Sequence, residues 1–209
     1  KSVEFKETAR RYLGLGSSDA MTNAVTLVDK LLVYPLLGSY SLAVYNAGSA
    51  TGKFTALIMN PLNEVILVYL SKASEKGASK LLFVIIKLSF LFFVVLFAIM
   101  LPVIYLLSLL LYHQYIQDIT TILIFLSLAC AIGTVSSVLK NFILKYAKPR
   151  QLTACYAINL FVLALGGSLG AKLYGLVGFS FAIVCVRLLL WLSFISVLFI
   201  CIRKEQVQK

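Results

Sequence analysis

The distribution of positive charge along the chain is the feature that most constrains its fold. Long apolar stretches alternate with short polar segments, and Lys and Arg collect in every second polar segment. Thirteen of the 19 Lys and Arg residues lie in segments 1–17, 72–80, 145–150 and 203–209. The intervening segments 38–42, 109–119 and 168–174 hold only Lys172. This alternation is typical of membrane-spanning helices, and the positive-inside rule predicts that both termini and the basic loops lie in the cytoplasm.

Composition supports a membrane protein and argues against a nucleic-acid-binding one. Hydrophobic residues make up 61% of the chain and charged residues 13%, which is outside the usual range of soluble domains. The net charge of +11 could suggest binding to DNA or RNA. The aromatic residues, however, lie inside apolar runs and not beside cations on a solvated face. We therefore predict no nucleic-acid partner.

We predict an all-α, polytopic protein of the cell membrane with six transmembrane helices, at 18–38, 43–70, 81–109, 119–145, 152–171 and 175–202. Each range reaches the roughly 20 residues that cross a hydrocarbon core. A transmembrane barrel would need strict alternation, whereas runs such as 90–101 are apolar on every side. Residues 18–202 would form one six-helix lobe, and residues 203–209 a cytoplasmic tail.

The segment 1–17 is too charged to be a signal peptide. We expect a cytoplasmic connector within a longer protein. Its apolar residues recur at helical intervals opposite its cations, which favours a short amphipathic helix on the inner membrane surface. An unstructured linker is an equally good interpretation.

Five charged residues lie deep inside the predicted spans, namely Asp29, Lys30, Lys53, Glu64 and Arg187. A charge at the centre of a spanning helix costs about 2.5 to 3.5 kcal/mol, so the five would together cost on the order of 15 kcal/mol if they faced lipid. We expect them to face each other or a wet cavity.

Helical spacing groups several of these residues. Lys53, Asn60 and Glu64 are seven and four residues apart, which returns them to within about 20° of one line along a helix. The pair Asn60-Pro61 predicts a kink beside the carboxylate of Glu64. Such a kink fits a transporter binding site, and it fits a packing device equally well.

Two segments resemble a known family. The first runs from Val28 to Tyr45, with Asp29-Lys30 inside a helix followed by Gly38, a short turn and a Tyr-x-x-Ala step. The second, 173–182, reads Leu-Tyr-Gly-Leu-Val-Gly-Phe-Ser-Phe-Ala. Both are similar to the C-terminal half of flippases for lipid-linked oligosaccharides, in the superfamily of multidrug, oligosaccharidyl-lipid and polysaccharide exporters.

The resemblance implies one six-helix lobe of a two-lobe transporter, whose second lobe belongs to the same chain or another. The implied substrate is a polyprenyl-diphosphate-linked oligosaccharide of polysaccharide biosynthesis, and membrane lipids would surround the lobe. Phosphate oxygens accept charge-assisted hydrogen bonds from Lys and Arg. We therefore assign Lys30, Lys53, Asn60 and Arg187 to substrate binding, and Asp29 and Glu64 to counter-charge or coupling.

Two other functions remain open. In a cation-coupled exporter of small molecules, Asp29 and Glu64 would bind Na⁺ or H⁺. An intramembrane assembly subunit or enzyme is the third possibility. An enzyme is disfavoured because no nucleophile elbow or His-Glu-x-x-His motif occurs. The four cysteines and the single His113 have no metal-type spacing, so we expect no metal and no cofactor beyond a coupling ion.

Overall fold

The computed structural model describes residues 27–50, 52, 65, 78–146 and 149–207, and almost all of them are helical. The labelled elements are α2 (Ala78–Leu111), the one-turn helix η1 (His113–Tyr115), α3 (Ile116–Tyr146) and α4 (Pro149–Val207). Within these described residues, four segments are long and apolar enough to cross a membrane, namely Leu27–Ala50, Ser89–Leu111, His113–Leu144 and Arg150–Cys201. The predicted all-helical fold, with helices long and apolar enough to span a membrane, is confirmed.

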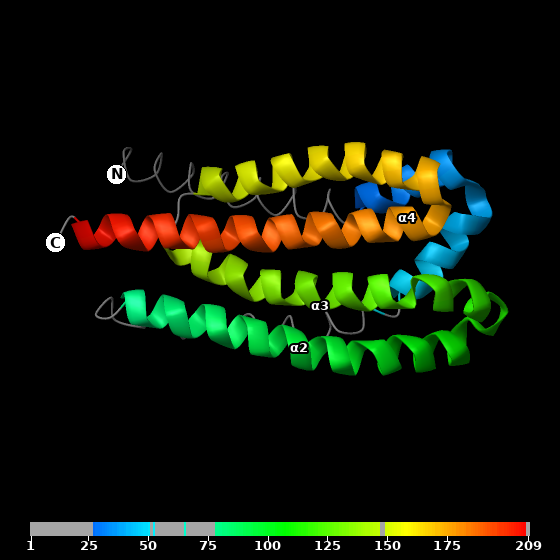
Figure 1. Ribbon diagram of the computed structural model, residues 1–209, viewed down its shortest axis with the longest axis horizontal. Helices are drawn as coiled ribbons and strands as arrows, with labels where there is room; N and C mark the ends of the chain where they lie inside the picture. Colours follow the sequence, from blue (N-terminus) through cyan, green and yellow to red (C-terminus); the bar gives the residue numbers. More distant parts are fainter. Residues whose placement is uncertain (1–26, 51, 53–64, 66–77, 147–148, 208–209) are drawn as a thin grey trace, which may run out of the picture.

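The helices lie side by side along the long axis of the molecule (Figure 1). The start of α2, the junction of α3 with α4 and the end of α4 lie at one end, on the left of the view. The reversal from α2 to α3 and the bend of α4 lie at the opposite end. The chain therefore alternates between the two ends of a bundle, as the alternation of basic and neutral segments predicts.

Two of the four segments are bent at a glycine with positive φ. Leu27–Ala50 bends at Gly38, whose φ is 81°. Within α4 the helical backbone breaks at Tyr174 and Gly175, and Gly175 has φ 61° and ψ −140°. Residues with a Cβ rarely adopt this conformation, which explains glycine at the bend. We call residues 149–173 the first arm of α4 and residues 176–207 the second arm.

The predicted spans correspond to these helices in a simple way. Ranges 81–109 and 119–145 fall inside α2 and α3, and ranges 152–171 and 175–202 fall on the two arms of α4. The first two ranges, 18–38 and 43–70, are described only in part, and 1–17 lies outside the described residues. Six separate spans remain a prediction.

The reversal between α2 and α3 takes only a few residues. The backbone N–H of Tyr112 donates to the carbonyl of Ser108 at 2.9 Å, and that of Tyr115 donates to the carbonyl of Tyr112 at 2.9 Å. These bonds use backbone groups that a helix end would otherwise leave unpaired. The turn lies in the neutral segment 109–119, where we expected one.

The two arms of α4 approach each other at Gly170 and Gly178. A Cβ added at Gly170 would lie 2.5 Å from the carbonyl oxygen of Gly178, and one at Gly178 would collide with the carbonyl oxygen of Gly170. Backbone therefore packs directly on backbone beside the bend. This contact gives a physical reason for the second glycine in the segment 173–182, as the positive φ does for Gly175.

Four clusters of buried hydrophobic residues hold the described helices together, and two of them surround the residues of interest. One joins Leu27–Ala50 to α3 and α4 through residues such as Val33, Ile119 and Phe179, all of them fully buried. The other joins α3 to both arms of α4 around Leu139 and Phe194. The charged and polar residues of interest lie between these two clusters and beside the first.

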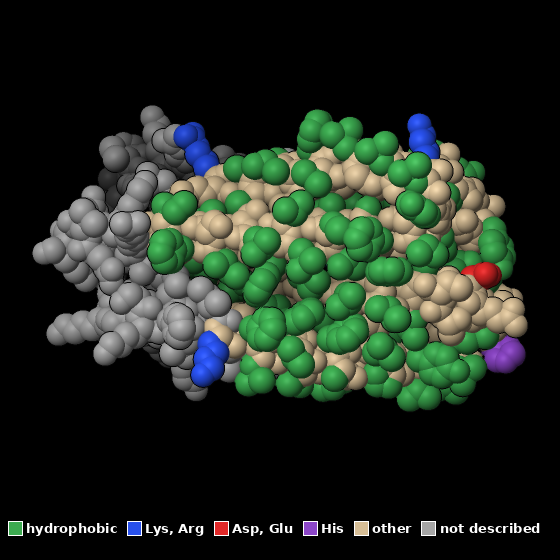
Figure 2. Space-filling view, in the orientation of Figure 1, with side chains coloured by type: hydrophobic (Ala, Val, Ile, Leu, Met, Phe, Trp, Pro, Cys, Tyr) green, Lys and Arg blue, Asp and Glu red, His purple; other side chains and the backbone are tan. Residues whose placement is uncertain are grey.

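The outer surface is suited to a hydrocarbon environment. Hydrophobic side chains cover the middle of the face shown in Figure 2, and charged and His side chains lie toward its two ends. Large apolar residues such as Leu31, Leu110 and Phe161 are 69%, 77% and 66% exposed. Many Ser and Thr hydroxyls on the helices bond within their own helix, for example Ser136 to the carbonyl of Ile132 at 2.8 Å. A surface of this kind is compatible with a membrane, where no water is present to satisfy polar groups.

Candidate functional site

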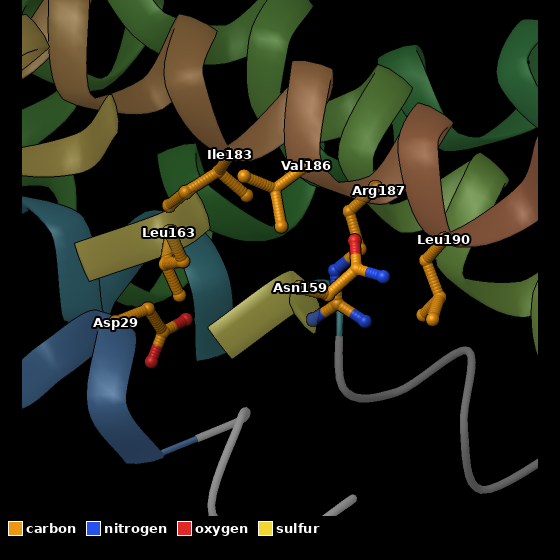
Figure 3. A pocket seen from close by; sticks show the side chains of 7 residues that line it. All are labelled: Asp29, Asn159, Leu163, Ile183, Val186, Arg187 and Leu190. Carbon is orange, nitrogen blue, oxygen red and sulfur yellow. The ribbon is translucent and has the colours of Figure 1, made fainter. Parts of the chain in front are cut away.

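A polar pocket lies between Leu27–Ala50 and the two arms of α4 (Figure 3). Its cavity volume is about 10 Å³, which is room for about one water molecule. Three polar residues and four aliphatic ones line it: Asp29, Asn159, Arg187, Leu163, Ile183, Val186 and Leu190. An anionic, a cationic and an amide side chain thus meet in an otherwise apolar wall.

Asp29 is positioned by a hydrogen bond across the bend at Gly38. The hydroxyl of Tyr45 donates to Oδ2 of Asp29 at 2.8 Å, and the backbone N–H of Lys30 donates to Oδ1 at 2.7 Å. Tyr45 is only 3% exposed, and its ring packs edge-on against Phe179 with centroids 5.8 Å apart. The carboxylate is therefore fixed by both sides of the bent segment and, through Tyr45, by the second arm of α4.

Arg187 enters the pocket from the second arm of α4. Its side chain passes over Gly133 of α3, where a Cβ would lie 3.5 Å from Nη1. Figure 3 shows Asp29 and Arg187 reaching from different helices into the space between them. The two opposite charges attract each other.

Asn159 supplies the third polar group, from the first arm of α4. It is 2% exposed, and its Nδ2 donates to the carbonyl of Cys155 at 2.8 Å. This bond leaves Oδ1 as a buried acceptor without a hydrogen-bond partner among the described residues. A buried polar atom in this state calls for a donor, because leaving it unpaired costs about 1 to 3 kcal/mol.

The structure brings together two of the predicted site residues, Asp29 and Arg187, which are 158 positions apart in the sequence. Lys30 is half-buried beside Asp29 and does not line the pocket. Lys53, Asn60 and Glu64 lie outside the described residues, and so does the predicted kink at Asn60-Pro61. Their assignment to the site remains a prediction.

Sequence reasoning missed Asn159 and Tyr45 as members of the site. Asn159 could have been noticed as an amide in the middle of the apolar range 152–171. Tyr45 gave no such signal, since tyrosines are frequent near the ends of spanning helices. Its role is visible only from the hydrogen bond to Asp29.

A second polar cluster lies where Leu27–Ala50 approaches the start of α3. The hydroxyl of Tyr40 donates to Oδ2 of Asp118 at 2.5 Å, and the rings of Tyr40 and Tyr115 pack edge-on at 5.9 Å. Tyr40 is exposed, as is the neighbouring His113. Aromatic residues at a helix end are typical of the membrane interface. Among the described residues there is no group of three His, Cys, Asp or Glu side chains that could hold a metal ion.

No protein-family model, curated protein or solved structure matches this chain. The pocket and its chemistry are therefore the basis of the functional argument.

Proposed function

We propose that this chain is one six-helix lobe of a two-lobe transporter that flips a polyprenyl-diphosphate-linked oligosaccharide across a membrane by alternating access. The observation that carries the proposal is the polar pocket between helices that are apolar enough to span a membrane. A polar pocket at this place costs folding free energy, so a binding role is the simplest reason to have one.

The chemistry of the pocket suits a phosphate group. Arg187 presents a planar set of donors that matches phosphate oxygens, and it is charged at any physiological pH. The carboxylate of Asp29 balances this charge when the pocket is empty, which lowers the cost of keeping a cation there. A bound phosphate would contact Arg187 and take over from Asp29 as the group that balances its charge. Such an exchange gives the empty and loaded states different stabilities, which alternating access requires.

The bends support the predicted topology. Gly38 and Gly175 each interrupt a segment that is apolar enough to span a membrane, and Arg150–Cys201, with 52 residues, is too long for a single straight span. With a reversal at each bend, the chain would cross the membrane six times. The two glycines also lie in the two segments that resemble the flippase family.

Reconstituted transport tests this function. The protein in its natural assembly would be placed in vesicles with a fluorescent polyprenyl-diphosphate sugar, and the flipping rate normalised to folded protein. We expect Arg187→Ala to lower the rate roughly tenfold to a hundredfold, since a hydrogen bond to a charged group contributes about 1.5 to 3 kcal/mol. Arg187→Lys should lose less if charge dominates, and equally much if the planar geometry does.

The matched control is Arg150→Ala, which removes an exposed Arg at the start of α4, away from the pocket. It should flip substrate at the wild-type rate. A normal rate per folded molecule in Arg187→Ala would mean that Arg187 only bridges helices, and the proposal would be wrong.

A further inference from the structure

The pocket contains the oxygen atoms that a monovalent metal cation would bind. Asp29 contributes a carboxylate, and Asn159 contributes a buried carbonyl oxygen that has no donor within the described chain. Hard cations prefer such carboxylate and carbonyl oxygens. Taken without Arg187, these groups would be reasonable ligands for Na⁺.

Arg187, however, already places a positive charge in the same pocket. A guanidinium group does not lose its proton in a protein, so this charge is permanent. The backbone N–H of Lys30 and the hydroxyl of Tyr45 already donate to the two oxygens of Asp29, and the side-chain charge of Lys30 also attracts the carboxylate. A metal ion entering here would meet the repulsion of Arg187 in surroundings where charges are poorly screened.

We propose that Arg187 takes the place of a metal cation, so that the pocket does not bind Na⁺ and becomes a Na⁺ site only when Arg187 is replaced by a neutral residue. The guanidinium is the counter-ion of Asp29, and it is covalently attached to the second arm of α4. The charge of the pocket is therefore balanced without an ion from solution.

One consequence concerns energy coupling and rests on the proposed transport function. A transporter whose carboxylate is already neutralised by its own Arg needs no Na⁺ at that carboxylate. Flipping by the wild-type protein should then be the same in Na⁺ and in choline at equal ionic strength. The binding part of the proposal stands without this step, because it can be tested in the absence of transport.

Thermal unfolding of the purified protein tests the binding part. Ligands that bind the folded state raise the unfolding temperature. We expect the Tm of the wild-type protein and of Arg187→Lys to be equal in NaCl and in choline chloride. Arg187→Gln should show a Tm higher in NaCl by roughly 2 to 4 °C. The double variant Asp29→Asn with Arg187→Gln should lose this difference, because the carboxylate ligand is gone.

Arg150→Gln is the matched control, since it removes an exposed Arg outside the pocket. It should behave as the wild type does. A Na⁺-dependent Tm in the wild-type protein that disappears in Asp29→Asn would overturn the proposal, as would a Na⁺-insensitive Arg187→Gln that folds normally.

If Arg187→Gln folds poorly, its folding can still show whether Arg187 is the counter-ion of Asp29. If the variant folds only when Na⁺ is present during extraction, or if adding Asp29→Asn restores the yield, then Arg187 is the counter-ion of Asp29. If neither change helps, Arg187 supports the helices by packing alone and the proposal fails. If the wild-type protein has the same Tm in NaCl and in choline chloride but does not flip the substrate, the proposed transport function is wrong. The result on ion binding is unchanged in that case.

Discussion

Tyr45 connects three parts of the molecule through a single side chain. Its hydroxyl bonds to Asp29 on the other side of the bend at Gly38, and its ring packs against Phe179 on α4. The hydrogen bond stabilises a charge that would otherwise be costly to keep half-buried among helices. The aromatic contact needs only the ring. Removing the hydroxyl alone therefore separates the two contributions.

We predict that Tyr45→Phe lowers the free energy of unfolding by about 1.5 to 3 kcal/mol, because a hydrogen bond to a charged acceptor is lost while the packing against Phe179 remains. Thermal or denaturant unfolding in detergent would measure the change. Tyr34→Phe is the control, since Tyr34 lies on the same segment and is 60% exposed.

Combining Tyr45→Phe with Asp29→Asn identifies the partner of the hydroxyl. If the two residues act together, the effects of the single variants should not add. Strictly additive effects would show that the hydrogen bond contributes nothing to stability.

At the level of residues, the sequence allowed part of the site to be predicted. Asp29 and Arg187 stand out because charges inside apolar runs are rare and costly. Their meeting could not be deduced, because helical spacing relates residues on one helix and says nothing about two helices more than 100 positions apart. Lys30 was grouped with Arg187 for its charge, yet the pocket does not include it. Neighbours on a helix point about 100° apart, so at most one of Asp29 and Lys30 can face a narrow pocket directly.

Among the elements, α4 shows best how the sequence sets the fold. Its two arms are held at the bend by the positive φ of Gly175 and by the backbone contact of Gly170 with Gly178. A break between two spans was predicted here, from the neutral segment 168–174 where the apolar ranges 152–171 and 175–202 meet. The backbone contact was not, since a glycine in a membrane helix has several possible uses.

We predict that Gly178→Ala destabilises the protein by about 1 to 3 kcal/mol, because the added Cβ collides with the backbone of Gly170 and the arms must separate. The unfolding temperature would show the change. Gly166→Ala is the control on the same helix, where a Cβ meets nothing within 4 Å. It should be neutral or slightly stabilising, because alanine favours the helix by about 1 kcal/mol. Equal effects of the two substitutions would contradict the close packing of the arms.

The described helices run back and forth between two ends of the molecule, and the sequence segments at these two ends differ in charge. The start of α2, the α3–α4 junction and the end of α4 share one end, and the corresponding sequence segments are basic (Figure 1). The other end carries the reversals at η1 and Gly175. This arrangement could be predicted because charge asymmetry acts over the whole chain and does not depend on the details of packing.

We predict that both termini lie on the cytoplasmic side. In a protein whose native cysteines have been replaced, a cysteine at Gln114 in η1 should react with an impermeant thiol reagent on intact cells. A cysteine at Ser79, at the start of α2, should react only after permeabilisation. The reverse pattern would place the basic end outside and contradict the assignment.

The short reversals at the η1 end also affect how the protein can be handled. Proteases cut, and insertions are tolerated, mainly at exposed loop tips. The turn at Tyr112–Tyr115 and the bend at Gly175 contain very few residues outside helices. Backbone hydrogen bonds hold the turn, and the backbone contact of Gly170 with Gly178 holds the bend. We therefore expect epitope tags inserted at either place to unfold the protein. An antibody selected against this end should recognise a folded, rigid epitope, and it should not bind the denatured chain on a blot.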